Sequence, residues 1–368
     1  MAARARTVHL SRRTFSSLKS TGVLKIGLIP ADGIGREVIP AARDAILALG
    51  SDLPKTEFIH LDAGWDHFTR RGVALPDETV EALKQDCDGA LFGAVSSPSN
   101  RVTGYSSPIV GLRRALDLYA NIRPVIDVPK DPEAKPSVDL VVVRENTECL
   151  YVKQETLIST DRGKEARATR LITEHASRRI GTKAFDIALT RPRKLLTIIH
   201  KSNVLSITDG LFRDTVKGIP KRPENGDKYL GVTVADQIVD SAVYRLFREP
   251  QIYDVMVAPN LYGDILSDAA AALVGSLGVV PSVNAGDDFV MGEPVHGSAP
   301  DIAGQNKANP MAAIRSAALM LRYMGYEAPA DRIDRAVDSV LRDGRTLTPD
   351  LGGKAGTSDV VDAILKRI

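Results

Sequence analysis

Two aspartates four residues apart offer the most direct route to metal chemistry in this sequence. Asp264 and Asp268 lie in PNLYGDILSDAAAALVGSLG, directly after the apolar run Val255–Ala258. In a helix this spacing places both carboxylates on one face. Two like charges held together resist ionising, and a divalent cation such as Mg²⁺ or Mn²⁺ removes the conflict. The neighbours are apolar, which predicts a face packed against protein: Ile265, Leu266, Ala269 and Ala270. An isolated D-x-x-x-D more often faces solvent, so the rest of the chain must decide.

Basic and phenolic side chains elsewhere supply candidates for binding and proton transfer. Arginine forks bind carboxylates, and Arg113, Arg123 and Arg144 are candidates, although each alone is more often a surface ion-pair partner. Arg144 closes the apolar run of VVVRENTECLY, at a strand end where α/β proteins hold ligands. Tyr151 lies seven residues later. Lys201 ends the run LLTIIHK, where burial would make it a general base, unless its ammonium simply reaches solvent.

The elements that position these residues alternate between strands and helices, which predicts an α/β fold with a largely parallel sheet. The expected strands are Leu24–Pro30, Thr56–Asp62, Asp88–Val95, Val138–Val143, Leu195–His200, Gly231–Ala235 and Tyr253–Ala258. The expected helices are Ile34–Leu49, Pro76–Lys84, Lys164–Leu189, Ile238–Phe247, Asn309–Met324 and Ala330–Leu341. A length of 368 residues predicts two lobes, with the chain crossing at Pro124–Pro136 and returning near Pro281. Residues 22–123 and 282–368 would form a large domain, and 124–281 a smaller one.

Composition excludes several classes of protein. No run approaches the roughly 20 apolar residues of a membrane-spanning helix. With 1 Trp, 9 Tyr and 8 Phe, the chain lacks aromatic platforms for nucleic acid. The two cysteines, Cys87 and Cys149, have no metal-site spacing, which indicates a reducing compartment and neither zinc nor a disulfide framework.

The first 21 residues have a composition of their own. They carry five basic residues and no acid, and without them the formal net charge of +2 becomes slightly negative. A leader rich in Arg and Ser is typical of a mitochondrial transit peptide, and Arg13-Thr14-Phe15 resembles a matrix-protease site. The alternative is a basic tail that carries no targeting signal. We therefore expect a transit peptide at 1–21 and a location in the mitochondrial matrix.

The motif Gly33-Ile34-Gly35 after the first expected strand looks like the opening of a dinucleotide fingerprint. The third glycine is missing, because Val38 occupies its position. A partial G-x-G is a weak signal, so we interpret it as a tight turn into a helix.

Six ordered motifs together resemble the β-hydroxyacid oxidative decarboxylases, a family that includes isocitrate, 3-isopropylmalate and homoisocitrate dehydrogenases. They are LIPADGIGREV, LDLYANIRP, VRENTE, HKSNV, NLYGDILSD and EPVHGSAPDIAG. The resemblance runs from about Leu24 to Ile368. It implies a two-lobed α/β fold with parallel or mixed sheets flanked by helices and an NAD site that is not a Rossmann fingerprint. It also implies that the large domain binds the cofactor and that the smaller one serves dimerisation, metal and substrate. The implied assembly is a homodimer, with pairing of two dimers into a tetramer left open.

The resemblance assigns roles residue by residue. Arg113, Arg123 and Arg144 would clamp substrate carboxylates, with Ser107 and Asn203 beside them. Apart from the resemblance, Arg101 and Tyr105 are polar residues of the segment before Arg113 and are further candidates for the distal carboxylate. Mg²⁺ or Mn²⁺ would be held by Asp264, Asp268 and Asp240 of the partner subunit. Lys201, which also reaches across the dimer interface, would take the hydroxyl proton, and Tyr151 would protonate the enol carbon.

The family's adenosine segment corresponds to EPVHGSAPD. It implies NAD contacts at Glu293, His296, Gly297, Ser298, Ala299, Asp301 and Asn309, with Asn203 also near the cofactor. Asp301 would accept hydrogen bonds from the ribose hydroxyls and repel a 2′-phosphate, so NAD is expected and not NADP.

Substrate choice depends on the segment Ser96–Gly111. Isocitrate enzymes carry an asparagine at the position of Ile109, and some homoisocitrate enzymes carry an arginine at that of Val110. This apolar pair could equally suit an isopropyl group, so 3-isopropylmalate remains an alternative substrate. Whole-chain resemblance favours the branch of fungal mitochondrial homoisocitrate dehydrogenases. A non-catalytic regulatory subunit is the alternative of another class, although such subunits lose residues that are present here.

Overall fold

The computed structural model describes residues 22–98, 100 and 102–368, which form two compact units. The first unit contains the chain up to Leu118, then Arg123–Val138 and Ala271–Ile368; the second contains Tyr119–Ile122 and Asp139–Ala270. The expected boundaries differ in three places, since Tyr119–Ile122 groups with the second unit, residues 124–138 group with the first unit, and the second unit ends at Ala270. The segment before Pro281 joins the first unit because Leu277–Val279 packs against a helix of that unit.

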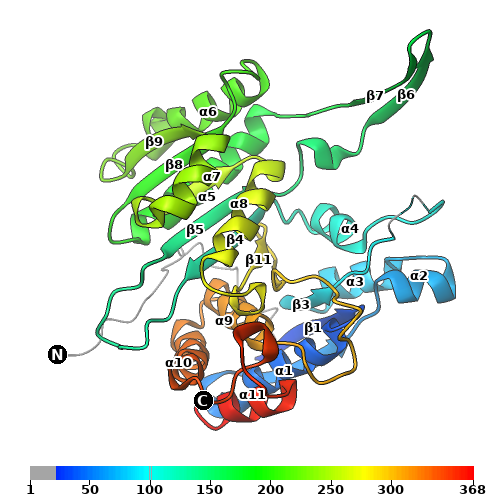
Figure 1. Cartoon of the computed structure of the whole chain (residues 1–368), viewed down its shortest axis with the longest axis vertical. Helices are drawn as coiled ribbons and strands as arrows, with labels where there is room; N and C mark the ends of the chain where they lie inside the picture. The colour runs from blue at the N-terminus through cyan, green and yellow to red at the C-terminus, as the bar shows by residue number, and fades with distance from the viewer. Residues whose placement is uncertain (1–21, 99, 101) are drawn as a thin grey trace. The chain divides into compact units, whose positions relative to one another are not determined.

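The first unit is built on mostly parallel strands in the order β2-β1-β3-β12-β11 (Figure 1). β1 (Val23–Ala31) pairs in parallel with β2 (Lys55–His60) and β3 (Gly89–Ala94). β12 (Val290–Gly292) runs parallel to β3, and β11 (Val283–Ala285) is antiparallel to β12, so the sheet is mixed. β3 is buried along its whole length, as expected of a parallel strand covered on both faces.

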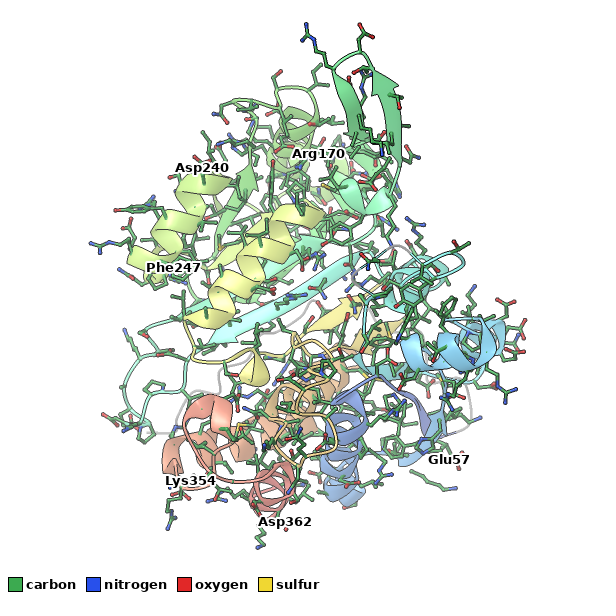
Figure 2. All side chains as sticks on the ribbon, turned by 45° about the vertical axis from the view of Figure 1, so that its right-hand side comes forward. Glu57, Arg170, Asp240, Phe247, Lys354 and Asp362 are labelled. Atoms are coloured by element: carbon green, nitrogen blue, oxygen red, sulfur yellow. The ribbon has the colours of Figure 1, made fainter. Side chains whose placement is uncertain are left out.

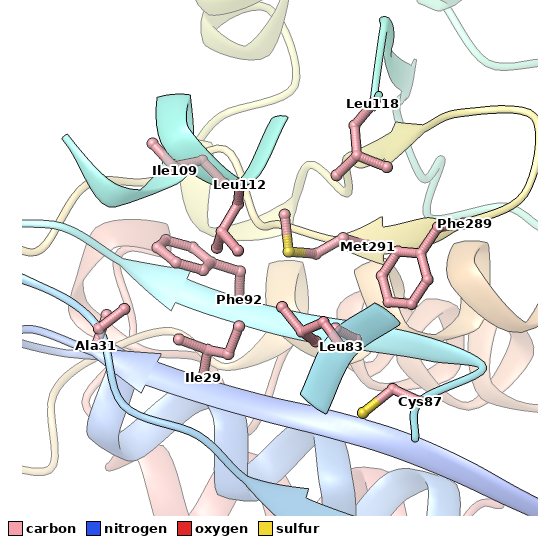
Figure 3. Packing of buried hydrophobic residues seen from close by; sticks show 12 residues of the cluster. Ile29, Ala31, Leu83, Cys87, Phe92, Ile109, Leu112, Leu118, Phe289 and Met291 are labelled. Carbon is pink, nitrogen blue, oxygen red and sulfur yellow. The ribbon is translucent and has the colours of Figure 1, made fainter. Parts of the chain in front are cut away.

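Helices α1 (Gly35–Ala48), α9 (Met311–Tyr323), α10 (Glu327–Asp343) and α11 (Thr357–Leu365) pack on one another. α2 (Trp65–Arg71), α3 (Asp77–Gln85) and α4 (Pro108–Ala115) follow β2 and β3. Figure 3 shows the buried cluster in which side chains of β1, β3 and β12 meet those of α3 and α4: Ile29, Phe92, Met291, Leu83, Ile109 and Leu112. This core fixes the position of α4, which carries Arg113.

The second unit has parallel strands in the order β5-β10-β8-β9. These are β5 (Asp139–Glu145), β10 (Val255–Ala258), β8 (Leu195–His200) and β9 (Thr233–Ile238). α5 (Glu174–Thr190) packs on β5, β8 and β10 and against α6 (Thr208–Gly218), and α7 (Val239–Arg248) packs on β8 and β9. α8 (Asn260–Ala272) follows β10 directly, and β4 (Ala120–Ile126) passes from the second unit into the first. Short 3-10 helices occur at Gly50–Asp52, Leu150–Val152, Ile219–Lys221, Pro223–Asn225, Pro250–Ile252, Leu277–Val279 and Pro349–Leu351.

Each expected strand is present, with ends shifted by up to three residues, but the expected helix Lys164–Leu189 is wrong in its first part. Residues 155–168 form an antiparallel hairpin, β6 (Glu155–Thr160) and β7 (Gly163–Ala168), which Figure 1 shows extending away from the rest of its unit. The hairpin turns at Gly163, whose φ of +105° favours glycine. The helix begins only at Glu174, where the Thr173 hydroxyl accepts a hydrogen bond from the Ala176 amide.

The turn at Gly33-Ile34-Gly35 is confirmed, since α1 begins at Gly35. The transit-peptide prediction lies in residues 1–21, outside the described part of the chain. Among the helices of residues 22–98, 100 and 102–368, none is long and apolar enough to cross a membrane.

Candidate active site

Three of the predicted site residues meet at Asp264 in the second unit. The Arg144 guanidinium donates to one carboxylate oxygen of Asp264, and the Tyr151 hydroxyl donates to the other at 2.5 Å. The guanidinium also lies 5.1 Å from the centre of the Tyr151 ring, within the range of a cation–π contact. The Arg144 side chain is only 3% exposed and that of Asp264 is 36% exposed. A buried cation and a phenol therefore converge on a carboxylate that reaches the surface.

Two residues of α8 explain why Arg144 and Asp264 come so close. Asn260 accepts a hydrogen bond from Arg144 Nε at 3.0 Å and donates to the Glu148 carbonyl at 3.3 Å. A Cβ on Gly263 would lie 2.6 Å from Cβ and Cγ of Arg144. Only glycine at this position lets the first turn of α8 lie against the end of β5.

Glu145 shapes the turn between Arg144 and Tyr151, and sequence reasoning missed it. Its carboxylate accepts hydrogen bonds from the Thr147 amide and hydroxyl, at 2.8 and 2.6 Å, and from the Glu148 amide at 2.9 Å. Burial raises the pKa of Glu145, although these hydrogen bonds oppose the shift. The signal was present in the sequence as a strand-end carboxylate followed by Asn and Thr, a pattern typical of side chains that bond to a turn backbone.

The predicted metal ligands are only partly assembled within one chain. Asp268 is exposed one helical turn after Asp264, and the neighbouring Ile265 is 51% exposed, so the prediction that this face lies against protein is wrong for the single chain. Among the described residues, no three His, Cys, Asp or Glu side chains are grouped so that they could hold a metal ion. Asp240 thus does not join the two aspartates of α8 within the chain.

The donor set nevertheless fits a hard cation. Asp264 and Asp268 offer carboxylate oxygens one turn apart on an accessible face, which suits Mg²⁺ and leaves the other coordination positions to water, substrate or a second chain. In this structure the positive charge next to Asp264 comes from Arg144.

Lys201 and Asp240 form a second group on the same unit. The Lys201 ammonium donates to Asp240 at 2.5 Å, and the side chains are 27% and 68% exposed. This hydrogen bond lowers the pKa of Asp240. The expectation that burial desolvates Lys201 is wrong for the single chain, because its ammonium is accessible and ion-paired. Asn203 lies exposed two residues later, and Figure 2 marks Asp240 on α7.

A polar network that sequence reasoning missed supports the strand end that carries Lys201. His200 Nε2 lies 2.9 Å from Asp236, and the Ser202 amide lies 3.1 Å from His200 Nδ1. Burial raises the pKa of Asp236, but hydrogen bonds from Lys217 and His200 outweigh it and leave that pKa below its ordinary value. Asp236 is thus committed to internal partners, and Asp240 is the more accessible of the two aspartates.

In the first unit, a predicted substrate residue and a predicted cofactor residue bind each other. Arg113 Nη2 lies 3.1 Å from Glu293, which also accepts a hydrogen bond from Asn284. Burial alone would raise the pKa of Glu293, but Arg113, Asn284 and Arg123 lower it overall. The Nε atom of Arg113 is buried without a hydrogen-bond partner. Arg113 and Arg123 therefore both act on Glu293, while Arg144 belongs to the second unit.

The predicted cofactor segment is held by the turn at Gly33. The Ile34 amide donates to the Ser298 carbonyl at 2.9 Å, and a Cβ on Gly33 would lie 2.0 Å from that carbonyl oxygen. Glu37 of α1 accepts hydrogen bonds from the Gly304 and Asn306 amides. The partial G-x-G motif therefore contacts the expected NAD segment, although it is not itself a dinucleotide fingerprint.

Two side chains of this segment fit a nucleotide. The Asp301 carboxylate is exposed and makes no hydrogen bond or ion pair with the described residues. His296 Nε2 is buried and has no hydrogen-bond partner there, and burial lowers the pKa of His296. Gly297 is exposed, and Ala299 has a φ of +37°. An accepting carboxylate and an unpaired ring nitrogen are suitable partners for ribose hydroxyls and a purine base.

Asn309 has a role that the resemblance did not indicate. Its side-chain oxygen accepts a hydrogen bond from the Met311 amide at 3.0 Å, and its amide donates to Asp350 at 2.9 Å. The side chain therefore holds the start of α9.

The predicted substrate segment is described except at positions 99 and 101, so the assignment of Arg101 lies outside the described residues. Tyr105 donates its hydroxyl to the Ser96 carbonyl at 3.1 Å, and Ser107 lies at the N-cap of α4. A cavity of about 590 Å³, lined by residues of β1, α1, α2 and the segment between β2 and α2, contains none of the predicted site residues.

Two α/β units with a carboxylate-binding arginine, a tyrosine, a lysine and accessible aspartates define an enzyme that acts on a small acidic molecule. The chain belongs to the isocitrate/isopropylmalate dehydrogenase family, whose sequence model matches residues 25–364. It is 51% identical over 344 residues to an isocitrate/homoisocitrate dehydrogenase of Thermus thermophilus, covering 94% of this chain and 98% of that protein. It is 44% identical over 348 residues to a 3-isopropylmalate/3-methylmalate dehydrogenase of Methanocaldococcus jannaschii, with the same coverage.

Solved structures agree with this membership. The isocitrate dehydrogenase of Methylococcus capsulatus superposes with a TM-score of 0.85 at 40% identity, covering 94% of this chain and 99% of that one. The predicted α/β fold with a mixed sheet flanked by helices is confirmed. The protein is thus an oxidoreductase of the β-hydroxyacid oxidative decarboxylase family, whose members generally use NAD(P) and a divalent metal. The names of its relatives include four substrates, isocitrate, homoisocitrate, 3-isopropylmalate and 3-methylmalate, and do not resolve which one it uses.

Proposed function

We propose that the protein is a homoisocitrate dehydrogenase of the fungal mitochondrial type. It would oxidise and decarboxylate homoisocitrate to 2-oxoadipate and CO₂, using NAD and Mg²⁺, in the α-aminoadipate route to lysine. The competing substrate is 3-isopropylmalate, which the apolar pair Ile109-Val110 left open.

The packing of Ile109 carries the preference for homoisocitrate. Ile109 is 9% exposed and lies in the core cluster of the first unit with Leu112 and Phe92 (Figure 3). Val110 is partly buried and packs against that cluster. These side chains are therefore engaged in holding α4 and are not free to line a pocket for an isopropyl group. No local feature then argues against homoisocitrate as the substrate, which is favoured by the similarity of two motifs, GYSSPIVGLRR and VRENTECLYVK, to homoisocitrate enzymes.

The chain's own residues would act as follows. Arg113, Arg123 and Arg144 bind substrate carboxylates, which is the chemistry that their buried guanidinium groups suit. Lys201 takes the proton of the 2-hydroxyl, for which it must first release the proton it shares with Asp240. After CO₂ leaves, Tyr151 gives its phenolic proton to the enol carbon, and its bond to Asp264 orients the hydroxyl. Bound NAD supplies the hydride acceptor, and a divalent cation held by Asp264, Asp268 and Asp240 of the partner subunit supplies positive charge for the developing oxyanion.

The placement of two groups of residues supports a homodimer with shared active sites as part of this proposal. Lys201 and Asp240 form one group and Tyr151 and Asp264 another. Within the described residues, no three His, Cys, Asp or Glu side chains are grouped so that they could hold a metal ion. Among the described residues, most of the exposed large apolar side chains lie in the second unit, including Val204, Ile207, Tyr244, Phe247 and Ile265. The β6–β7 hairpin is almost wholly exposed, although two strands alone are marginally stable in water. A second copy that covers these surfaces would bring the two groups together.

Delivery to the mitochondrial matrix is part of the proposal and depends on the leader at 1–21. A fusion of residues 1–30 to a fluorescent protein should localise to mitochondria and be shortened on import. Diffuse fluorescence of an uncleaved fusion would contradict this address.

The deciding experiment compares NADH formation from homoisocitrate, isocitrate and 3-isopropylmalate, with and without Mg²⁺, by the purified dimer. Homoisocitrate should give the highest kcat/KM. A higher value for 3-isopropylmalate would replace the proposed substrate. Folded protein that reduces NAD with none of the three would favour a regulatory subunit.

A further inference from the structure

Three aromatic rings gather where α2 lies against the segment between β3 and α4. Trp65 and Phe68 belong to α2, and Tyr105 belongs to residues 96–107, here called the substrate segment. The Tyr105 ring stands edge-on to Trp65 at 5.1 Å and 81°, and to Phe68 at 5.2 Å and 73°. Trp65 and Phe68 stack at 5.5 Å. Edge-to-face geometry is favourable for aromatic pairs, so Tyr105 is held by two neighbours.

The buried carboxylate of Asp32 also connects α2 with the substrate segment. Asp32, which is 1% exposed, accepts hydrogen bonds from the Trp65 amide at 2.7 Å, the Asp66 amide at 3.0 Å and the Ser96 amide at 3.0 Å. Gly64 permits this approach, because its φ is +117° and a Cβ there would lie 2.7 Å from the Asp32 carboxylate. One side chain at the end of β1 thus fixes the start of α2 and the start of the substrate segment.

Tyr105 closes the arrangement. Its hydroxyl donates to the Ser96 carbonyl at 3.1 Å, so the backbone of Ser96 is held at its amide by Asp32 and at its carbonyl by Tyr105. The segment between them then leads through Ser107 into α4 and Arg113. Trp65 takes part in both sets of contacts, because its amide donates to Asp32 and its ring contacts Tyr105.

We propose that Trp65 is a positioning residue that sets the conformation of the substrate segment, and hence the affinity for the acidic substrate. The inference rests on the proposed function and on the expectation from the sequence that residues 96–111 determine substrate choice. Because Trp65 is the only tryptophan of the chain, its fluorescence also reports directly on this segment.

The kinetic test compares Trp65→Ala and Trp65→Phe with Val73→Ala, an exposed residue just after α2. Two aromatic contacts of ordinary strength predict that Trp65→Ala raises KM for homoisocitrate about tenfold, with a much smaller change in kcat and in KM for NAD. Trp65→Phe keeps a ring and should restore most of the affinity. Equal KM values in a folded Trp65→Ala dimer and the Val73→Ala control would overturn the proposal.

A second test, the rate of cleavage by trypsin, does not depend on turnover. Arg101 is the only basic residue among positions 96–107, so trypsin can cut the substrate segment there and nowhere else. Trp65→Ala should accelerate that cleavage several-fold relative to Val73→Ala, because loosened segments open more often. In the wild type, saturating homoisocitrate should slow the cleavage and change the Trp65 emission. An unchanged cleavage rate in Trp65→Ala would overturn the anchoring itself. If no acid is oxidised but cleavage accelerates, the proposed function fails while the anchoring by Trp65 stands.

Discussion

Arg113 and Glu293 form an ion pair, at 3.1 Å, between two segments that were expected to bind different ligands. Arg113 lies on α4 and, by resemblance, is expected to bind a substrate carboxylate. Glu293 is the first residue of the segment expected to hold the adenosine of NAD. Their side chains are mostly buried, so the pair is shielded from water. Within the first unit it ties the position of the substrate arginine to that of the cofactor segment.

Glu293→Gln should lower the free energy of unfolding at pH 7 by about 1–3 kcal/mol, because it leaves the buried Arg113 charge without its counter-charge. The folded-state pKa of Glu293 is below its ordinary value. Its contribution is therefore complete above the unfolded pKa of about 4.5 and disappears as pH falls through the folded pKa. Urea unfolding should separate wild type from variant at pH 7 and bring them together as the pH falls through the folded pKa of Glu293.

Glu249→Gln provides the matched control, since Glu249 pairs with Arg245 one helical turn earlier at a solvent-exposed position. Surface pairs of this kind contribute roughly 0–1 kcal/mol. If Glu293→Gln cost no more than this control at pH 7, the ion pair would not be the link described here.

Two inactive variants should restore activity to each other. Lys201→Met removes the proton acceptor and Tyr151→Phe impairs decarboxylation and enol protonation, and these residues lie in separate groups on one chain. In a mixed dimer with shared sites, one site carries both defects and the other carries none. Random mixing of equal amounts then predicts about a quarter of wild-type turnover, since half of the dimers are mixed.

The measurement is NADH formation after the two variants are unfolded together and refolded, compared with each variant refolded alone. Turnover that stays at the level of the separate variants, in dimers shown to be mixed by mass spectrometry, would mean that each site lies within one chain.

Gly263→Ala should disable the site without touching a reacting group. Its Cβ would lie 2.6 Å from Arg144, and neither the β-strand backbone nor the buried guanidinium can move far. Overpacking of this kind costs about 1–3 kcal/mol in stability, and a displaced Arg144 should reduce kcat/KM by about a hundredfold. Gly210→Ala, in helix α6 with nothing within 4 Å of its Cβ, should leave kcat/KM unchanged. Similar kcat/KM values for the two variants would show that the close approach at Gly263 is not needed.

Sequence reasoning found the elements that have a clear period and missed those that depend on partners. The parallel strands and their strand-end residues Arg144 and Lys201 follow from apolar runs, whose burial needs no knowledge of the rest of the chain. β7 was predicted as the first part of a helix and β6 was not predicted, because these strands have no buried face and so no alternation marks them. The Arg113–Glu293 pair joins residues 180 positions apart, and Asp32 reaches 64 positions to Ser96. Such long-range bonds leave no local signal.

Asp268→Asn tests the proposed metal site. Mn²⁺ with homoisocitrate should raise the melting temperature of the wild-type dimer, because a ligand that binds only the folded state stabilises it. Asp268 is exposed on α8 one turn after Asp264, so replacing its charged oxygen by an amide should not disturb folding. It should raise the Mn²⁺ concentration that gives half of the melting shift about tenfold or more, since a hard cation binds a neutral amide more weakly than a carboxylate.

The control is Asp227→Asn, which makes the same change at an exposed turn of the second unit and should leave the Mn²⁺ dependence unaltered. The melting shift is the primary readout because it reports cation binding even when turnover is lost. Steady-state kinetics should follow it, with a raised Mn²⁺ requirement and a recoverable kcat at saturating Mn²⁺, because Asp264 remains in place. If Asp268→Asn and Asp227→Asn needed the same Mn²⁺ concentration, the carboxylate pair on α8 would not be the cation site, and the oxyanion formed on substrate oxidation would need another source of positive charge.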